Sequence, residues 1–285
     1  MDSLIKLLSN VVNTLLIVGV LSTSVYAKTH KSTPQKSQDS ILATNYIVKD
    51  LDTGEIFKEK NSQEVRSIAS ITKLMTAVVV LNARQNLDEI ITFNKPKGIH
   101  SRLPNGLKLP RSSLLLLALM SSDNAAAKLL AQNYPGGEEA AIAAMNSTAI
   151  SLGMDHTQFA DPTGLLPENV STVSDLSKLI DHAYTFGIIR EYSTKSSERI
   201  QVPGKKKSYF VDFHTTNSLV AKDNNIGLSK TGWIRNSGGC LVMIVRTQGH
   251  RLAVILLNSR NTHTRIRDGV LLTEYDNARN HRNFR

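Results

Sequence analysis

The spacing of apolar residues changes along the chain, and this change most limits the folds available to it. Between residues 70 and 187 apolar side chains recur at helical spacing, which predicts helices over about 70–84, 112–133, 137–152 and 172–187. Shorter apolar runs predict strands near both ends. Near the N-terminus, NYIVKDLDTGEIF predicts two strands joined by a turn at Asp52-Thr53-Gly54; toward the C-terminus the runs are YFVDF, NIGLSKTGWI, GCLVMIVRT and RLAVILLN.

The last three of these runs are separated by short turns, which predicts an antiparallel meander. The stretch 92–110 is rich in proline and glycine and predicts loops, and a final helix is predicted over 263–278. Strands at both ends with helices between them are typical of an α+β domain. We therefore expect one antiparallel sheet built from N- and C-terminal strands, with a helical subdomain inserted between them.

The first 27 residues differ from the rest and predict an export signal. Lys6 precedes the apolar stretch 11–21, and Val25 and Ala27 are the small residues that a signal-peptidase site requires. A membrane anchor is the alternative, but the apolar stretch is short and contains Asn13. We expect a cleaved signal peptide over 1–27, a disordered linker over 28–40, a folded catalytic domain over 41–272 and a basic tail over 273–285.

The chain carries 34 Lys and Arg against 24 Asp and Glu, a net charge of +10. Such a charge is compatible with nucleic acid, with an anionic polymer of the cell envelope, or with no particular partner. The basic residues are scattered apart from Lys205–Lys207 and the final RNHRNFR, aromatic residues make up 5%, and no nucleic-acid motif is present. We therefore expect no nucleic-acid partner. The single cysteine, Cys240, excludes an intrachain disulfide and is expected to be a small buried side chain.

Three short motifs carry the candidate chemistry. Ser70 stands three residues before Lys73, but this spacing alone is weak, because one or two such matches arise by chance and Ser3 and Lys6 form another. Ser122-Asp123-Asn124 follows in the predicted helical block, and Lys230-Thr231-Gly232 lies on a predicted strand. Lys-Thr-Gly occurs once, and the ordered combination of all three motifs is a much stronger signal than any one of them.

A serine and a lysine one helical turn apart can act as nucleophile and base. At the first turn of a helix Ser70 gains from the helix dipole, and its backbone N–H can donate to an oxyanion. Lys73 lies one turn later on the same face, within reach of the hydroxyl. Because a free lysine has a pKa of about 10.4, burial and a second cation such as Lys230 are needed to make a neutral amine accessible. The alternative for Lys73 is a solvated lysine on a helix surface.

The other motif residues suit the walls of a substrate cleft. Ser122 can relay a proton between Lys73 and a leaving group, and Asn124 can hold a substrate amide through its donor and its acceptor. Lys230 and Thr231, on an edge strand, can bind a substrate carboxylate. Each motif also has a structural alternative: Ser-Asp-Asn as a helix-breaking cluster that satisfies its own backbone, and the strand lysine as protection of a sheet edge.

Two residues complete the candidate site. Gly232 allows a substrate backbone to approach the strand closely, and Trp233 can lend its backbone N–H as a second oxyanion donor beside that of Ser70. The eight histidines show no metal-ligand spacing, and neither a Gly-x-Ser-x-Gly elbow nor a Gly-rich phosphate loop is present. We expect neither a metal nor another cofactor.

With these motifs the chain resembles the low-molecular-weight penicillin-binding proteins, and among them the D-alanyl-D-alanine endopeptidases. The resemblance runs from about residue 42 to 272 and includes IASITKLMTAVVVLNAR, LLLLALMSSDNAAA, YPGG, SLGM, PTGL, VSTVSDLSKLI and KTGW. It implies the β-lactamase/DD-peptidase-like fold, hydrolysis of D-Ala–diaminopimelate cross-links of peptidoglycan in the periplasm, and acylation of Ser70 by β-lactam antibiotics as covalent inhibitors.

Departures from relatives narrow this expectation. The deacylating Glu-x-x-Leu-Asn stretch of a class A β-lactamase is absent after Ser122-Asp123-Asn124. We find no counterpart of the β-rich domain and amphipathic anchor of the carboxypeptidase relatives, so we expect at most loose membrane association. A DD-carboxypeptidase that uses the same residues and an inactive peptidoglycan-binding scaffold are the alternatives. The intact Ser70 and Lys73 argue against the scaffold, because a binding module needs no nucleophile.

Overall fold

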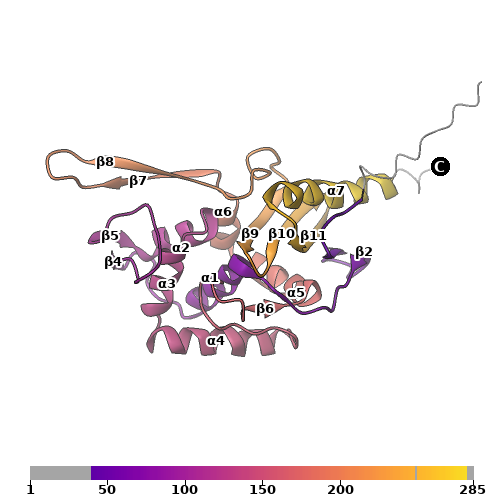
Figure 1. The fold of residues 1–285 in the computed structure, drawn as a ribbon, viewed down its shortest axis with the longest axis horizontal. Helices are drawn as coiled ribbons and strands as arrows, with labels where there is room; N and C mark the ends of the chain where they lie inside the picture. Colours follow the sequence, from indigo (N-terminus) through magenta and orange to yellow (C-terminus); the bar gives the residue numbers. More distant parts are fainter. Residues whose placement is uncertain (1–39, 248, 281–285) are drawn as a thin grey trace, which may run out of the picture. The chain divides into compact units, whose positions relative to one another are not determined.

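A five-stranded antiparallel sheet forms the centre of the computed structural model, which describes residues 40–247 and 249–280 (Figure 1). The strand order is β2 (Ile56–Lys60), β1 (Asn45–Asp50), β11 (His250–Ser259), β10 (Gly238–Thr247) and β9 (Ile226–Ile234). The predicted meander is confirmed, because β9, β10 and β11 are neighbours in chain order. The predicted joining of the two ends of the chain is also confirmed, since β1 pairs with β11 from Asn45–Leu257 to Asp50–Leu252.

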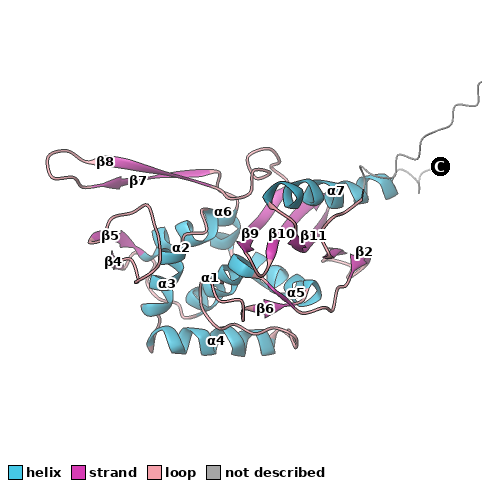
Figure 2. Ribbon diagram, in the orientation of Figure 1, coloured by secondary structure: helices cyan, strands magenta, loops and turns pink. Residues whose placement is uncertain are grey.

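Both faces of the sheet are buried except along the edge strand β2, and alternate residues of its inner strands contribute to two separate cores. Val242 and Ile255 belong to the larger core, whereas Met243 and Val254 belong to the smaller one. Helix α5 (Val173–Tyr184) contributes to the larger core and helix α7 (Thr262–Asn280) to the smaller, so the two helices cover opposite faces. Figure 2 shows the resulting layers, with the sheet between helices. An apolar run on both faces is typical of a strand covered in this way.

The helical block between the two halves of the sheet is more divided than the sequence predicts. Its elements are η1 (Ala69–Ile71), α1 (Thr72–Asn82), α2 (Arg111–Met120), α3 (Asn124–Gln132), α4 (Gly137–Ser151), α5 and α6 (Gly187–Ser193). The single helix predicted over 112–133 is wrong, because the chain breaks between Met120 and Asn124. Ser122 has a φ of 59°, outside the helical region, and the Asp123 carboxylate caps α3 by accepting from the Ala126 N–H.

Short two-stranded sheets surround the helical block. They are β3 (Arg66–Ser67) with β6 (Val170–Ser171), β4 (Ile90–Phe93) with β5 (Leu107–Pro110), and β7 (Ser197–Val202) with β8 (Tyr209–His214). The β7–β8 hairpin extends over β4 and β5 in Figure 1. Strand β7 and helix α6 were not predicted. In β7 the apolar residues Ile200 and Val202 alternate with polar ones, so the strand pattern begins before the predicted run YFVDF.

Only some of the predicted domain boundaries fall within the described residues. The signal peptide over 1–27 and the linker up to residue 39 lie outside the described residues. Helix α7 continues to Asn280, across the predicted boundary between catalytic domain and tail at 272–273, and Leu272 is fully buried in the smaller core. Within the described part of the chain, no helix is both long enough and apolar enough to span a membrane.

Candidate active site

Ser70 lies in a 3-10 turn immediately before α1, rather than in the first turn of the α-helix itself. Two glycines pack directly against this turn. A Cβ on Gly232 would lie 3.0 Å from the Ser70 nitrogen, and a Cβ on Gly164 would lie 1.9 Å from the carbonyl oxygen of Ala69. Ala69 itself has a φ of 47°, which is uncommon for a residue with a side chain. The backbone around Ser70 is thus held in an unusual conformation by contacts on two sides.

Lys73 is completely buried, and its amine lies at the centre of the site. Its Nζ is 2.7 Å from Ser70 Oγ, 2.7 Å from Asn124 Oδ1 and 2.6 Å from the carbonyl oxygen of Thr163. Burial lowers the pKa of Lys73 to about 7, although the carboxylates of Asp161 and Asp123 oppose the shift. The interpretation of Lys73 as a solvated surface lysine is therefore wrong.

The three contacts of Lys73 fit both protonation states of its amine. As an ammonium, Lys73 donates to Ser70 Oγ, Asn124 Oδ1 and the carbonyl oxygen of Thr163. A neutral amine has two N–H donors and one lone pair. The carbonyl oxygen of Thr163 and the Oδ1 atom of Asn124 can only accept, so in the neutral form they take the two N–H groups and the lone pair is left for the Ser70 hydroxyl.

Ser122 and Lys230 form a second pair beside the first. Lys230 Nζ donates to Ser122 Oγ at 2.8 Å and to the carbonyl oxygen of Thr231 at 2.8 Å. Burial lowers the pKa of Lys230 well below its ordinary value, and repulsion from the Lys73 and Arg265 cations adds to the effect. Repulsion from Lys73 thus disfavours the charge of Lys230. The sequence analysis expected the effect of Lys230 on Lys73, but burial is the cause that lowers the pKa of Lys73.

The structure changes the part expected of Asn124 and Gly232. The Oδ1 atom of Asn124 is already engaged by Lys73, so its Nδ2 group is the side-chain donor left for a substrate amide. Gly232 is needed for close approach, as expected, but the group that approaches it in the structure is the Ser70 turn. Trp233, the next residue, has a side chain that is 57% exposed. Its strand β9 is the edge strand of the sheet, so a substrate can lie along it.

A loop over residues 161–166, outside the three motifs, completes the site. The buried carboxylate of Asp161 accepts hydrogen bonds from the backbone N–H groups of Thr163, Gly164 and Leu166. This fixes the loop so that the Thr163 carbonyl faces Lys73. The Asp-Pro-Thr-Gly sequence signals a turn, but nothing in it shows that a backbone carbonyl would be a partner of the base.

Arg265 was also missed. This residue of α7 is 4% exposed, and its Nη1 donates to the carbonyl oxygen of Gly232 at 3.0 Å. It therefore supports the strand that carries Lys230 and adds a second positive charge next to it. Only the three-dimensional packing of α7 on the sheet brings it there, so no local sequence signal could have identified it.

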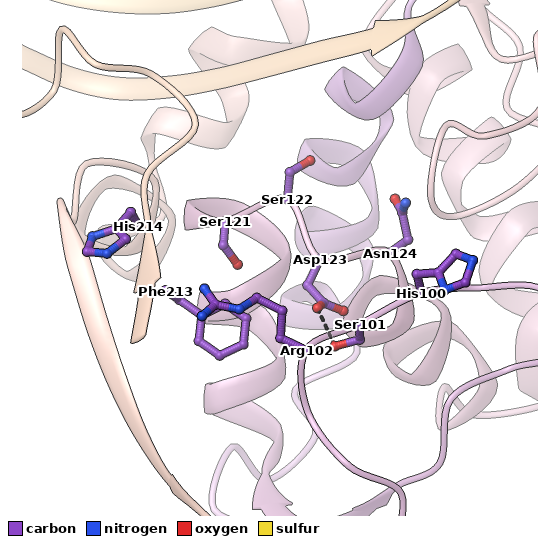
Figure 3. Close-up of a pocket in the computed structure, with 9 residues that line it drawn as sticks. All are labelled: His100, Ser101, Arg102, Ser121, Ser122, Asp123, Asn124, Phe213 and His214. Carbon is purple, nitrogen blue, oxygen red and sulfur yellow. Dashed lines mark hydrogen bonds between the residues drawn. The ribbon is translucent and has the colours of Figure 1, made fainter. Parts of the chain in front are cut away.

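A pocket of 540 Å³ opens beside these residues (Figure 3). Ser122 and Asn124, which contact Lys230 and Lys73, form one wall of the pocket, and His100, Arg102 and His214 lie around it. In Figure 3 Asp123 points away from Ser122 toward Ser101, whose hydroxyl donates to it at 2.6 Å. The pocket gives a ligand access to the Ser122–Asn124 side of the site.

Cys240 and the acidic side chains do not offer a second reactive centre. Cys240 is buried, and burial raises the pKa of its thiol to about 11, so a thiolate nucleophile is disfavoured. Asp50, Asp52 and His250 bring possible metal ligands within 4.8 Å of one another among the described residues. Asp50 already accepts from the backbone of the β1–β2 turn and Asp52 pairs with Arg251, so this group is explained as a turn and an ion pair.

Comparison with known proteins gives a consistent set of relatives. Residues 31–261 match the D-alanyl-D-alanine carboxypeptidase family, peptidase S11. A D-alanyl-D-alanine endopeptidase of Escherichia coli (strain K12) is 40% identical over 252 residues, which cover 86% of this chain and 80% of that protein. A D-alanyl-D-alanine endopeptidase of Pseudomonas aeruginosa is 36% identical over 91% of this chain and 86% of its own length.

Solved structures with the same fold include two of this kind of protein. The DD-transpeptidase of Streptomyces K15 superimposes with a TM-score of 0.78 at 26% identity, over 84% of this chain and 98% of that one. Penicillin-binding protein D2 of Listeria monocytogenes, in a cefotaxime-bound form, gives a TM-score of 0.72 at 26% identity, over 83% of this chain and 97% of that one.

Proposed function

The chain belongs to the D-alanyl-D-alanine carboxypeptidase family, peptidase S11, and on this premise we propose that it is a serine DD-endopeptidase that cleaves D-Ala–diaminopimelate cross-links of peptidoglycan. The observation that carries the chemistry is the buried Lys73 amine, 2.7 Å from the Ser70 hydroxyl. The relatives at 36–40% identity support cleavage of a cross-link rather than of a terminal residue, because both are named as endopeptidases.

In the acylation step, Lys73 accepts the proton of Ser70 as the serine oxygen attacks the carbonyl carbon of D-Ala. The backbone N–H groups of Ser70 and Trp233 stabilise the resulting oxyanion. The close packing of Gly232 on the Ser70 nitrogen supports this pairing, because it puts the strand before Trp233 beside the serine. Collapse of the tetrahedral intermediate breaks the C–N bond and leaves an acyl group on Ser70.

The leaving nitrogen needs a proton, and Ser122 supplies it. The proton that Lys73 took from Ser70 reaches this nitrogen through the Ser122 hydroxyl, which Lys230 holds at 2.8 Å, so Lys73 becomes neutral again. Water then attacks the acyl-enzyme. Lys73 accepts a proton from the water and returns it to the Ser70 oxygen as the ester bond breaks, which releases the shortened peptide and free Ser70. The groups that move these protons lie in two hydrogen-bonded pairs, Lys73 with Ser70 and Lys230 with Ser122.

Substrate binding is assigned to the remaining residues of the motifs. Asn124 donates through Nδ2 to a carbonyl of the acyl side of the peptide, and Thr231 and Lys230 bind a carboxylate on the leaving side. The cross-link and the free D-Ala–D-Ala terminus both carry a carboxylate on the carbon next to the scissile nitrogen. The same two residues therefore suit either substrate, and a DD-carboxypeptidase is the second candidate, favoured by the description of the matched family.

The same geometry supports β-lactam antibiotics as covalent inhibitors, because the strained lactam carbonyl takes the place of the scissile amide. The cefotaxime-bound relative supports this part of the proposal. An enzyme acting on peptidoglycan works outside the cytoplasm, so the proposal includes the periplasm and the export signal over 1–27.

Two measurements test the proposal. Fluorescent penicillin is expected to label the wild-type protein covalently, and Ser70→Ala is expected to abolish labelling while leaving the thermal unfolding curve nearly unchanged. Purified cross-linked muropeptide dimers are expected to be converted to monomers, identified by mass spectrometry. Labelling that persists in Ser70→Ala would refute the nucleophile, and release of free D-alanine from monomers without cleavage of dimers would favour the carboxypeptidase.

A further inference from the structure

The pocket of Figure 3 is called the catalytic pocket below. Two segments beside it carry most of the excess positive charge of the chain. Residues 94–110 and 199–214 together contain eight lysines and arginines and a single acidic residue, a balance of +7, whereas the whole chain has +10. We call the surface formed by these two segments the basic face. Its charged residues are Lys95, Lys97, Arg102, Lys108, Arg199, Lys205, Lys206, Lys207 and Asp212.

In the structure these two segments lie side by side, and the line of contact between them is called the seam below. The guanidinium of Arg102 donates to the backbone carbonyl of Asp212 and lies 5.5 Å from the centre of the Phe213 ring. The catalytic pocket lies at one end of the seam, where both segments line it. A second pocket, of 530 Å³, lies at the other end between Lys108 and Tyr209. The basic face is therefore continuous with the catalytic pocket.

The β7–β8 hairpin presents its two faces to different surroundings. Ile200, Val211 and Phe213 on one face are buried in the larger core and anchor the hairpin. At the far end, Tyr209 on this same face and Phe210 on the opposite one are 48% and 55% exposed. The Arg199 guanidinium lies 5.5 Å from the centre of the Phe210 ring.

The turn that connects β7 and β8 carries three lysines that form no ion pair within the described residues. Lys205, Lys206 and Lys207 are all exposed, and no ion pair involves any of them within residues 40–247 and 249–280. Three adjacent lysines repel one another, so without an anionic partner they gain nothing from their proximity. The combination of free cations with exposed aromatic rings points to a polymer that carries both acids and sugars.

We propose that the basic face is a second binding site, which holds the glycan–peptide polymer of peptidoglycan while a cross-link is bound at Ser70. The lysines of the hairpin turn pair with free carboxylates of neighbouring stem peptides, and Tyr209 and Phe210 pack against sugar rings. The inference rests on the proposed function, since it concerns the same polymer. Continuity with the catalytic pocket favours this polymer over nucleic acid or anionic lipid, neither of which has a bond for Ser70 to cleave.

Such a site has a clear physical benefit. Each contact between an exposed lysine and a carboxylate is weak, but several contacts along one insoluble polymer raise the effective concentration of the next cross-link at Ser70. The site should therefore affect the digestion of whole peptidoglycan and leave the chemistry at Ser70 unchanged.

The binding test uses the full chain with Ser70→Ala, so that the polymer is not digested, and measures how much protein pellets with purified peptidoglycan sacculi. The turn variant carries Lys205→Gln, Lys206→Gln and Lys207→Gln. The matched control removes the same charge from exposed residues elsewhere, through Lys60→Gln, Lys222→Gln and Arg246→Gln. We expect the apparent Kd for sacculi to rise about tenfold in the turn variant and less than about twofold in the control.

Two further measurements identify the partner groups. When the carboxylates of the sacculi are converted to amides, the difference between turn variant and control should disappear. With Ser70 intact, the turn variant should release muropeptides from sacculi more slowly than the control, while its acylation by a soluble chromogenic cephalosporin stays within about twofold of wild type. The thermal unfolding temperature of both variants shows whether they are folded.

Equal pelleting of the turn variant and the control would overturn the inference. So would a loss of binding that is seen with phosphatidylglycerol vesicles or duplex DNA but not with sacculi. Failure of the proposed function looks different: wild-type protein would then not be acylated by the cephalosporin at all, whatever the pelleting result.

Discussion

The pH dependence of acylation tests the role of Lys73 most directly. Lys73 can accept the Ser70 proton only in its neutral form, and its burial lowers its pKa to about 7. The acylation rate should therefore rise with pH through about 7 and level off above it. At pH 5, two units below that pKa, about 1% of the lysine is neutral, so acylation should be about 100-fold slower than on the plateau.

The assay is stopped-flow acylation by a chromogenic cephalosporin between pH 5 and pH 9, with far-ultraviolet circular dichroism at each pH to show that the protein stays folded. Lys73→Arg provides the comparison, because a guanidinium has no accessible neutral form. This variant should acylate slower than wild type by a factor of about 10²–10⁴ and lose the rise near pH 7. Its thermal unfolding must be measured as well, because Arg is bulkier than the lysine it replaces.

Two results would refute the reasoning. A wild-type rate that is independent of pH between 5 and 8 would mean that no group with a pKa of about 7 has to lose a proton before acylation. A near wild-type rate for folded Lys73→Arg would mean that Lys73 is not the base, whatever its burial.

Three further predictions follow from the contacts of the site. Asp123→Asn keeps the cap of α3 but removes a charge that raises the pKa of Lys73, so the rise in acylation rate should move to lower pH; an unchanged midpoint would contradict the electrostatic effect. Gly232→Ala puts a Cβ 3.0 Å from the Ser70 nitrogen and 2.9 Å from the carbonyl oxygen of Ile68, so it should slow acylation more than about tenfold in stopped-flow measurements and also lower the unfolding temperature. Asp161→Ala leaves several backbone N–H groups without an acceptor and should lower the free energy of unfolding, measured in urea, by about 3 kcal/mol; a loss below about 1 kcal/mol would show that the loop is held by other contacts.

The sheet could be predicted from the sequence because its strands are apolar runs bounded by turns. The runs at β9, β10 and β11 are each covered on both faces, so their hydrophobicity is continuous and easy to recognise. The break between α2 and α3 could not be predicted in the same way. Apolar residues keep helical spacing across it, and only the φ of 59° at Ser122 and the cap by Asp123 end one helix and begin the next.

The members of the site could be predicted, but not all of their partners. Ser70, Lys73, Ser122, Asn124 and Lys230 come together as the three motifs indicated. The carbonyl of Thr163 and the side chain of Arg265 were missed, because a backbone atom has no sequence signature and because Arg265 reaches the site only through the packing of α7. Local patterns report what a residue can do, whereas these two contacts depend on how distant segments pack.

The position of β11 in the sheet has a consequence for the order in which the protein can fold. This strand lies between β1 and β10, so β1 keeps only its short partner β2 until residues 250–259 are available. Contacts between residues so far apart in sequence form slowly, because a long loop must close first. While the chain is being synthesised or threaded through a channel from its N-terminus, Ile47 and Val48 of β1 therefore remain exposed to aggregation. A nascent chain that stops short of residue 259 cannot complete the sheet, however much of its catalytic sequence is already present.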